Sequence, residues 1–242
     1  MKNRKHLIET ISYLNDKAKQ QQKEYRLLSR SAGDHVHIFV KDEISSGVSI
    51  EDVLSDLKNT IPSHLMSHID AIYVGEFDIF KERGINAVYQ DGAIYVSNIQ
   101  NDAKDMVEDL VHEIAHAVES QYGHDIYSDR RLHAEFLGKR KKLYSLLKAH
   151  GYDIPLELFK DTEYDEYFDE KLYKDIGYAK LSEFTKGLFN TPYAATSLQE
   201  YFATGFEDYF TSINLRKYLT KVSPVLYYKI TSLEKKDEDD EY

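Results

Sequence analysis

The stretch VHEIAHAVES, residues 111–120, holds two histidines four residues apart, with a glutamate directly after the first. Asp102 can cap a helix that starts ahead of this stretch, and Gly123 can end it. The sequence therefore predicts about twenty residues of helix with this stretch at its centre. Its apolar positions, which suit burial of one face, are Leu110, Ile114, Ala117 and Val118.

On such a helix His112 and His116 project from one face, one turn apart, so both imidazoles can reach one tetrahedral zinc ion at about 2.0–2.1 Å. Glu113 then lies near the ion, where its carboxylate can take a proton from a zinc-bound water that attacks a carbonyl. The frequency with which the H-E-x-x-H pattern occurs by chance is on the order of one chain in a hundred. A helix with two hydrogen-bonded histidines and no metal is therefore the alternative.

The composition limits the kind of site and partner. The chain has 242 residues, 42% of them hydrophobic and 30% charged, which is typical of a folded globular protein. It has no cysteine, so zinc must be held by histidine and carboxylate. The net charge of −11 argues against nucleic-acid binding, which needs a concentrated basic face.

No apolar run approaches the ~18–20 residues of a membrane span. The first residues lack the apolar core of a signal peptide, because Glu9 and Asn15 interrupt it. We therefore expect no membrane span, and a protein that is cytoplasmic, virion-associated or exported by a non-classical route. The oligomeric state is left open.

Upstream of residues 111–120, the pattern predicts a small mixed sheet. HVHIFV (35–40) and AIYV (71–74) are strand-like, and Ser49 starts a helix between them that Pro62 closes. INAVYQDGAIYVSN (85–98) is two alternating runs around Asp91-Gly92, which indicates a hairpin with Ile94 and Val96 facing the core. Residues 2–30 have apolar positions at helical spacing, namely Leu7, Ile8, Ile11 and Leu14.

Downstream, the pattern is mainly helical, with helices over 129–150, from Ser197 to Phe210, and from Pro224 onward. DTEYDEYFDE (161–170) is interpreted as a solvated acidic face or loop, with a cation or substrate patch as the alternative. We predict an α+β fold: one domain over 1–233, with 124–185 as a helical, acidic insertion and 234–242 as a disordered acidic tail.

Three glutamates are candidates for a third zinc ligand. The extended H-E-x-x-H-x-x-G-x-x-H pattern fails, since Glu119 occupies the glycine position and Tyr122 the last histidine. Glu119 suits a supporting role better than ligation, and Glu135, nineteen residues after His116, lies among basic residues. Glu200 starts an aromatic-rich helix, where a buried carboxylate needs a partner such as zinc.

The segment PYAATSLQEYFATGFEDYF (192–210) resembles the catalytic domain of anthrax lethal factor and the Pro-Pro endopeptidases, a zincin group. In that group a tyrosine precedes the glutamate ligand by seven residues, as Tyr193 precedes Glu200. The resemblance covers residues 85–120 and 190–232. It implies a zincin-like fold and a zinc ion held by His112, His116 and Glu200. It also implies that Glu113 is the general base and that Tyr193 stabilises the oxyanion.

One departure concerns the residue four positions after Glu200. The family carries a second glutamate there, whereas this chain has Thr204, so Glu207 or Glu119 would have to orient the ligand. We therefore expect a zinc-dependent endopeptidase acting on a protein or peptide. In zincins an edge strand ahead of the active helix binds the substrate as an added strand, so the resemblance implies this role for NAVYQ (86–90) or AIYVS (93–97), with ordinary sheet structure as the alternative. The alternatives are a zincin-fold binding or structural module, for instance of a viral or toxin assembly, and a metal-free scaffold.

Overall fold

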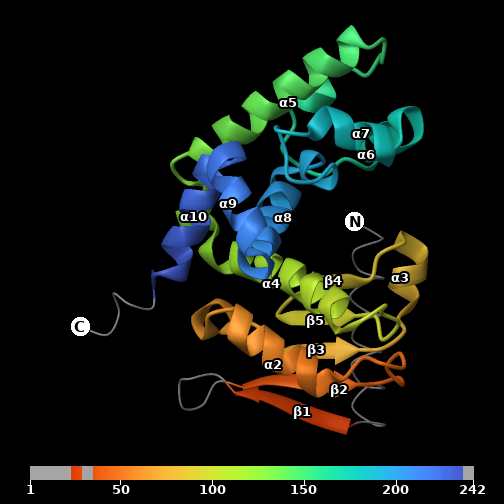
Figure 1. Ribbon diagram of the computed structural model, residues 1–242, viewed down its shortest axis with the longest axis vertical. Coiled ribbons are helices and arrows are strands. Elements are labelled where there is room, and N and C mark those ends of the chain that lie inside the picture. The colour runs from red at the N-terminus through yellow and green to blue at the C-terminus, as the bar shows by residue number, and fades with distance from the viewer. Residues whose placement is uncertain (1–22, 29–34, 237–242) are drawn as a thin grey trace. The chain divides into compact units, whose positions relative to one another are not determined.

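The computed structural model describes residues 23–28 and 35–236 (Figure 1). The chain divides into two compact units, residues 1–117 and 118–242. The first carries the sheet and the second is helical, so the expected α+β class with a small mixed sheet is confirmed. In the part of the chain that the structure describes, no helix is both long enough and apolar enough to cross a bilayer.

The sheet has five strands in the order β1-β2-β3-β5-β4. Their bounds are Lys23–Leu28 (β1), His35–Val40 (β2), Ala71–Val74 (β3), Ala87–Gln90 (β4) and Ala93–Val96 (β5). Strands β2, β3 and β5 run parallel, and β1 and β4 are antiparallel edges. The predicted helical spacing at residues 7–14 lies outside the described residues, and β1 was not predicted.

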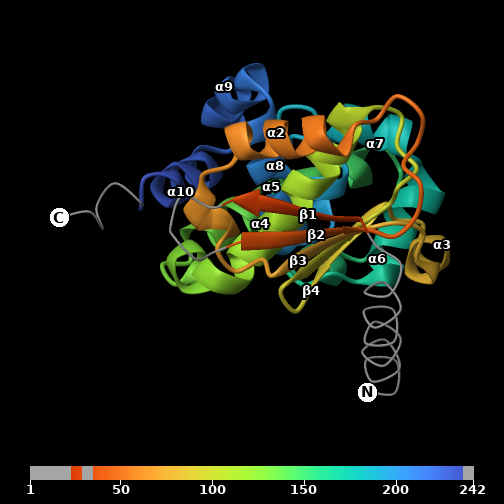
Figure 2. The ribbon, with the colours of Figure 1, turned by 90° about the horizontal axis from the view of Figure 1, so that it is seen from below.

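The expected strand–helix–strand unit is present. Helix α2, Ile50–Thr60, joins β2 to β3 and lies over one face of the sheet (Figure 2). Ser49 caps it by accepting a hydrogen bond from the amide of Asp52, as predicted. The hairpin is also confirmed, because Asp91 and Gly92 both take the positive φ, 47° and 85°, that a tight two-residue turn requires.

Both faces of the central strands are buried, and they differ in character. On one face Ile38, Ile72 and Ile94 are paired across the strands and are almost inaccessible to solvent. On the other face Phe39, Tyr73 and Tyr95 stack with ring centroids 5.2 and 5.1 Å apart. The short helix α3, Asp78–Arg83, which the sequence analysis missed, adds Phe80 to this aromatic cluster.

Helix α4, Ala103–Tyr127, begins as expected, with Asp102 accepting a hydrogen bond from the amide of Asp105 at 2.9 Å. Tyr122 (φ −106°, ψ 18°) is non-helical and divides α4 into two helical segments, so the first segment ends next to the predicted stop at Gly123. Gly123 itself does not take the left-handed conformation of a helix cap, and a second helical segment continues to Tyr127. The hydroxyl of Tyr127 donates to the carboxylate of Glu119, which ties the last turns together across the kink.

The second unit holds four principal helices besides the end of α4: Arg131–Ala149 (α5), Leu198–Thr211 (α8), Ile213–Val222 (α9) and Pro224–Glu234 (α10). The last starts at Pro224 as predicted, whereas α9 was not anticipated. Helices α8 and α10 approach closely at Gly205, where an added Cβ would lie 2.3 Å from the side chain of Leu226.

The acidic stretch 161–170 only partly matches its interpretation as a solvated face or loop. It enters α6, Glu166–Lys171, whose Phe168 is buried. Between α5 and α8 the chain also forms a short helical turn at Leu156–Phe159, a π-helical turn at Leu172–Ile176 and α7 at Tyr178–Thr185. The predicted disordered tail lies outside the described residues from 237 onward.

Candidate metal centre

His112 and His116 lie on one face of α4, as their spacing predicted. Their ring centroids are 5.2 Å apart and both side chains are half-buried. The residues between them, Ile114 and Ala115, are fully buried and fix which face of the helix turns inward. The two imidazoles are thus held one turn apart while remaining accessible to an ion.

Glu113 is oriented by the sheet. Its side chain is 8% exposed, and its Oε2 accepts a hydrogen bond from the backbone amide of Tyr89 at 2.6 Å. Tyr89 lies in β4, whose one partner among the described strands is β5. The residue pattern predicts the hairpin ahead of the helix but not this contact, because a backbone amide can belong to any residue type.

Glu200 lies in the first turn of α8. Ser197 caps this helix by accepting a hydrogen bond from the amide of Glu200 at 3.0 Å. The hydroxyl of Thr204 donates to the backbone carbonyl of Glu200 at 2.7 Å. Thr204 therefore steadies the main chain of the residue and does not replace a second glutamate as a support for its carboxylate.

The other two glutamates considered as ligands are engaged in the second unit. The carboxylate of Glu135 accepts hydrogen bonds from the hydroxyl of Tyr201 at 2.8 Å and from the amides of Val225 and Leu226 at 2.9 and 3.2 Å. It thus caps the start of α10. Glu119 is buried and accepts the hydrogen bond from Tyr127; burial and the charge of Glu119 raise the pKa of that phenol.

The donor atoms of His112, His116 and Glu200 all lie within 4.8 Å of one another, and all three side chains are half-buried. Donors that share one zinc ion at about 2.0–2.2 Å stand a little over 3 Å apart in a tetrahedral arrangement. A separation of no more than 4.8 Å is compatible with that arrangement. Two imidazoles and a carboxylate also form a donor set that zinc enzymes use, so these residues fit the ion.

Tyr193 occupies the short helical turn Tyr193–Ala195 ahead of α8. Burial, followed by the negative charge of Glu200, raises the pKa of its phenol, so the hydroxyl stays protonated at neutral pH. Among the described residues this hydroxyl makes no hydrogen bond. No described residue therefore uses this hydroxyl as a donor.

Acidic and phenolic side chains from the insertion surround Tyr193 and Glu200. The hydroxyl of Tyr164 donates to Asp169 at 3.2 Å. Burial and the neighbouring charge of Asp169 raise the pKa of Tyr164 to about 12. Burial also raises the pKa of Asp169, and the charge of Glu200 adds to the effect. The carboxylates of the insertion thus reinforce negative potential near Glu200.

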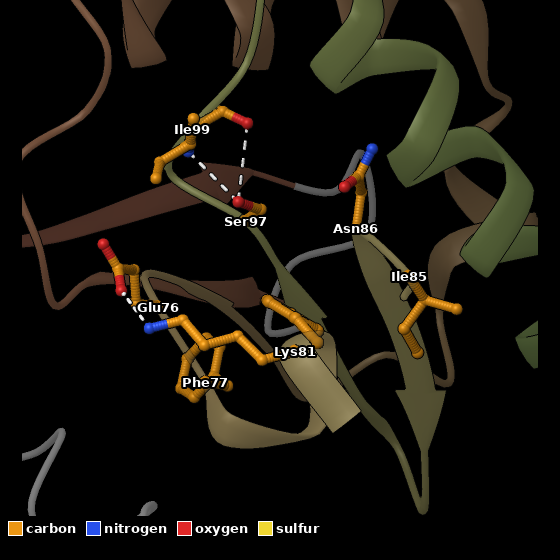
Figure 3. Close-up of a pocket in the computed structure, with 8 residues that line it drawn as sticks. Glu76, Phe77, Lys81, Ile85, Asn86, Ser97 and Ile99 are labelled. Carbon is orange, nitrogen blue, oxygen red and sulfur yellow. Dashed lines mark hydrogen bonds and ion pairs between the residues drawn. The ribbon is translucent and has the colours of Figure 1, made fainter. Parts of the chain in front are cut away.

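A separate hollow of about 260 Å³ lies beside α3 in the first unit (Figure 3). Its apolar lining comes from Phe77, Phe80, Ile85 and Ile99, and its rim includes an exposed ion pair between Lys81 and Glu76 at 3.0 Å. No histidine lines it, and its single carboxylate is in that ion pair. The hollow therefore lacks the groups that a metal centre needs.

Comparison of the chain with protein families, with curated proteins and with solved structures finds no match.

Proposed function

We propose that the protein is a zinc-dependent endopeptidase with a zincin-like fold, in which His112, His116 and Glu200 hold the ion. The observation that carries the proposal is the grouping of these three side chains within 4.8 Å. The resemblance of residues 192–210 to the lethal factor and Pro-Pro endopeptidase group supports the same ligands. So does the absence of cysteine, which leaves histidine and carboxylate as the zinc donors.

When bound, zinc would act as a Lewis acid that polarises a carbonyl and makes a water molecule more acidic. Glu113 takes the proton from the attacking water, while the amide of Tyr89 holds its carboxylate in place through Oε2. Glu113 can then pass that proton to the leaving amine. Tyr193 donates its hydroxyl hydrogen to the carbonyl oxygen as negative charge develops there.

A peptide substrate is proposed to pair with β4, the edge strand that holds Glu113 through Tyr89. Pairing of this kind uses main-chain hydrogen bonds, so it would bring an extended peptide bond alongside the base. Adding a strand to an exposed sheet edge is a general mode of peptide recognition.

Glu113→Gln tests the mechanism directly. This variant keeps the size and one acceptor oxygen of the side chain but cannot take a proton, so we expect hydrolysis of a peptide library to be lost while stoichiometric zinc is retained. Glu108→Gln on the same helix is the matched control, because Glu108 forms an ion pair with Lys104 and has no role in the proposed mechanism. Peptidase activity in Glu113→Gln would overturn the mechanism.

A zinc-holding module that cuts nothing is the second candidate, and one observation favours it. Thr204 binds the main chain of Glu200, where the family has a second carboxylate to support the ligand. Such a module would bind zinc and leave every peptide of the library intact in the wild-type protein. A metal-free scaffold would contain no stoichiometric zinc at all.

A further inference from the structure

Arg140 on α5 is a buried cation whose place in the fold requires an explanation. Its side chain is 1% exposed. Burial lowers its pKa to about 10, and the charge of Asp161 offsets only part of that effect. Since moving a charge out of water is costly unless other groups compensate, the surroundings of Arg140 must supply that compensation.

Three aromatic rings and two carbonyl groups surround the guanidinium. Its central carbon lies 5.2, 5.7 and 4.3 Å from the ring centroids of Phe136, Phe159 and Phe168, respectively, distances at which a cation is attracted to a ring face. Its Nη1 donates to the backbone carbonyl of Thr196 at 3.1 Å, and its Nη2 donates to that of Leu158. The planar fork of arginine thus joins two segments that are far apart in the sequence.

Thr196 stands between the two functional residues of this part of the chain. Both its amide and its hydroxyl donate to the backbone carbonyl of Tyr193, at 2.9 and 2.8 Å. The next residue, Ser197, caps the amide of Glu200. On the other side of Ser197, the amide of Leu198 donates to the carbonyl of Thr162 at 2.8 Å.

The turn from Tyr193 to Glu200 is therefore anchored on both sides of its helix cap. One anchor is the guanidinium of Arg140, and the other is the backbone of Thr162. Both belong to the insertion, residues 124–185, which has no counterpart in the resemblance. Four of the five groups that enclose the guanidinium come from the same segment, namely Phe136, Leu158, Phe159 and Phe168.

We propose that Arg140 is a positioning residue, which sets the metal affinity of the centre by fixing the turn that carries Glu200. The insertion between α4 and α8 then serves as a brace for this ligand. The inference rests on the proposed function only in taking Glu200 as a metal ligand, and it does not require peptidase activity. Lysine cannot replace Arg140 in this role, because a single ammonium group cannot span both carbonyls in the geometry of the fork.

The test uses cobalt(II) in place of zinc, because the visible absorption of bound cobalt depends on the number and kind of its ligands. Cobalt chloride is titrated into the metal-free full-length protein, and circular dichroism checks that each variant is folded.

For Arg140→Lys we expect the affinity for cobalt to fall about 10–100-fold, as when a group that orients a ligand is lost. We also expect the visible spectrum of bound cobalt to change. Arg140→Ala should behave likewise, and guanidinium ion should restore its affinity and spectrum by entering the vacated aromatic enclosure.

Lys139→Met is the matched control. Lys139 is the neighbouring buried cation on α5, but its ammonium donates to the hydroxyl of Ser223 at 2.6 Å, in the cap of α10. We expect this variant to bind cobalt like the wild type.

If the folded Arg140 variants also bind cobalt with wild-type affinity and spectrum, Arg140 has only a structural role and the inference is overturned. If the wild-type protein binds no cobalt, the proposed metal centre fails and the inference with it, whereas cobalt binding without peptidase activity contradicts the proposed hydrolysis alone.

Discussion

At the scale of single residues, substitution of Tyr193 should distinguish an effect on catalysis from an effect on stability. Its hydroxyl makes no hydrogen bond to another described residue, so Tyr193→Phe removes no such contact, and we expect the free energy of unfolding to change by less than about 0.5 kcal/mol. If the hydroxyl stabilises the oxyanion, kcat should fall about 10²–10³-fold, as it does when one oxyanion donor is removed. Peptide hydrolysis and urea denaturation measure the two effects, and an unchanged kcat would remove Tyr193 from the mechanism.

Glu135 and Glu200 were both candidates for the third ligand, and they should respond to substitution in opposite ways. Glu135→Ala removes the cap of α10 and the partner of Tyr201, so we expect the free energy of unfolding to fall by about 2 kcal/mol with zinc retained. Glu200→Ala should lose zinc. Metal analysis of the two purified variants decides the matter, and loss of zinc from Glu135→Ala would exchange their roles.

The sequence could not separate these glutamates by spacing alone. The partners of Glu135 lie at residues 201, 225 and 226, so its role as a cap depends on contacts between residues far apart in the chain. His112 and His116 were easier to place, because one turn of a helix sets their separation. The third ligand was suggested by the resemblance of residues 192–210, and no local pattern replaces that information.

At the scale of secondary structure elements, helix boundaries that depend on local chemistry could be predicted. Ser49, Ser197 and Pro224 each mark a helix start that the structure bears out. The first segment of α4 breaks at Tyr122, next to the predicted stop at Gly123, but Gly123 does not take a positive φ and a second helical segment follows it. Helices α3 and α9 were missed because they are short, with 6 and 10 residues, and offer little periodic pattern.

Helix α5 carries a charge whose burial should be visible in the pH dependence of stability. Burial lowers the pKa of Lys139 to about 8, below the value near 10.4 expected in the unfolded chain. Between these values the unfolded state binds more protons than the folded state, so the contribution of Lys139 to stability increases with pH and is lost as the pH falls towards 8. The increase is at most about 1.4 kcal/mol per pH unit.

The difference between wild type and Lys139→Met isolates this contribution. Urea denaturation at several values between pH 8 and pH 10 should show the wild type gaining stability relative to the variant. Tyrosines with raised pKa values, such as Tyr164, affect both proteins alike above that range. A constant difference over the window would mean that Lys139 is as fully protonated in the folded state as in the unfolded chain, so that burial does not lower its pKa.

At the scale of the whole molecule, zinc should stabilise the folded chain, because its proposed ligands come from residues 112 to 200 and are assembled only on folding. A ligand present at 100 times its Kd and bound only by the folded state adds about 2.7 kcal/mol. Calorimetry with and without zinc should therefore show a higher Tm for the zinc-loaded protein, reversed by a chelator. Glu200→Ala should lose most of this increase and Glu135→Ala should keep it, even though its own Tm is lower. An equal zinc-dependent rise in wild type and Glu200→Ala would show that the ion binds elsewhere, and the carboxylate of Glu200 would then have to be explained without a metal.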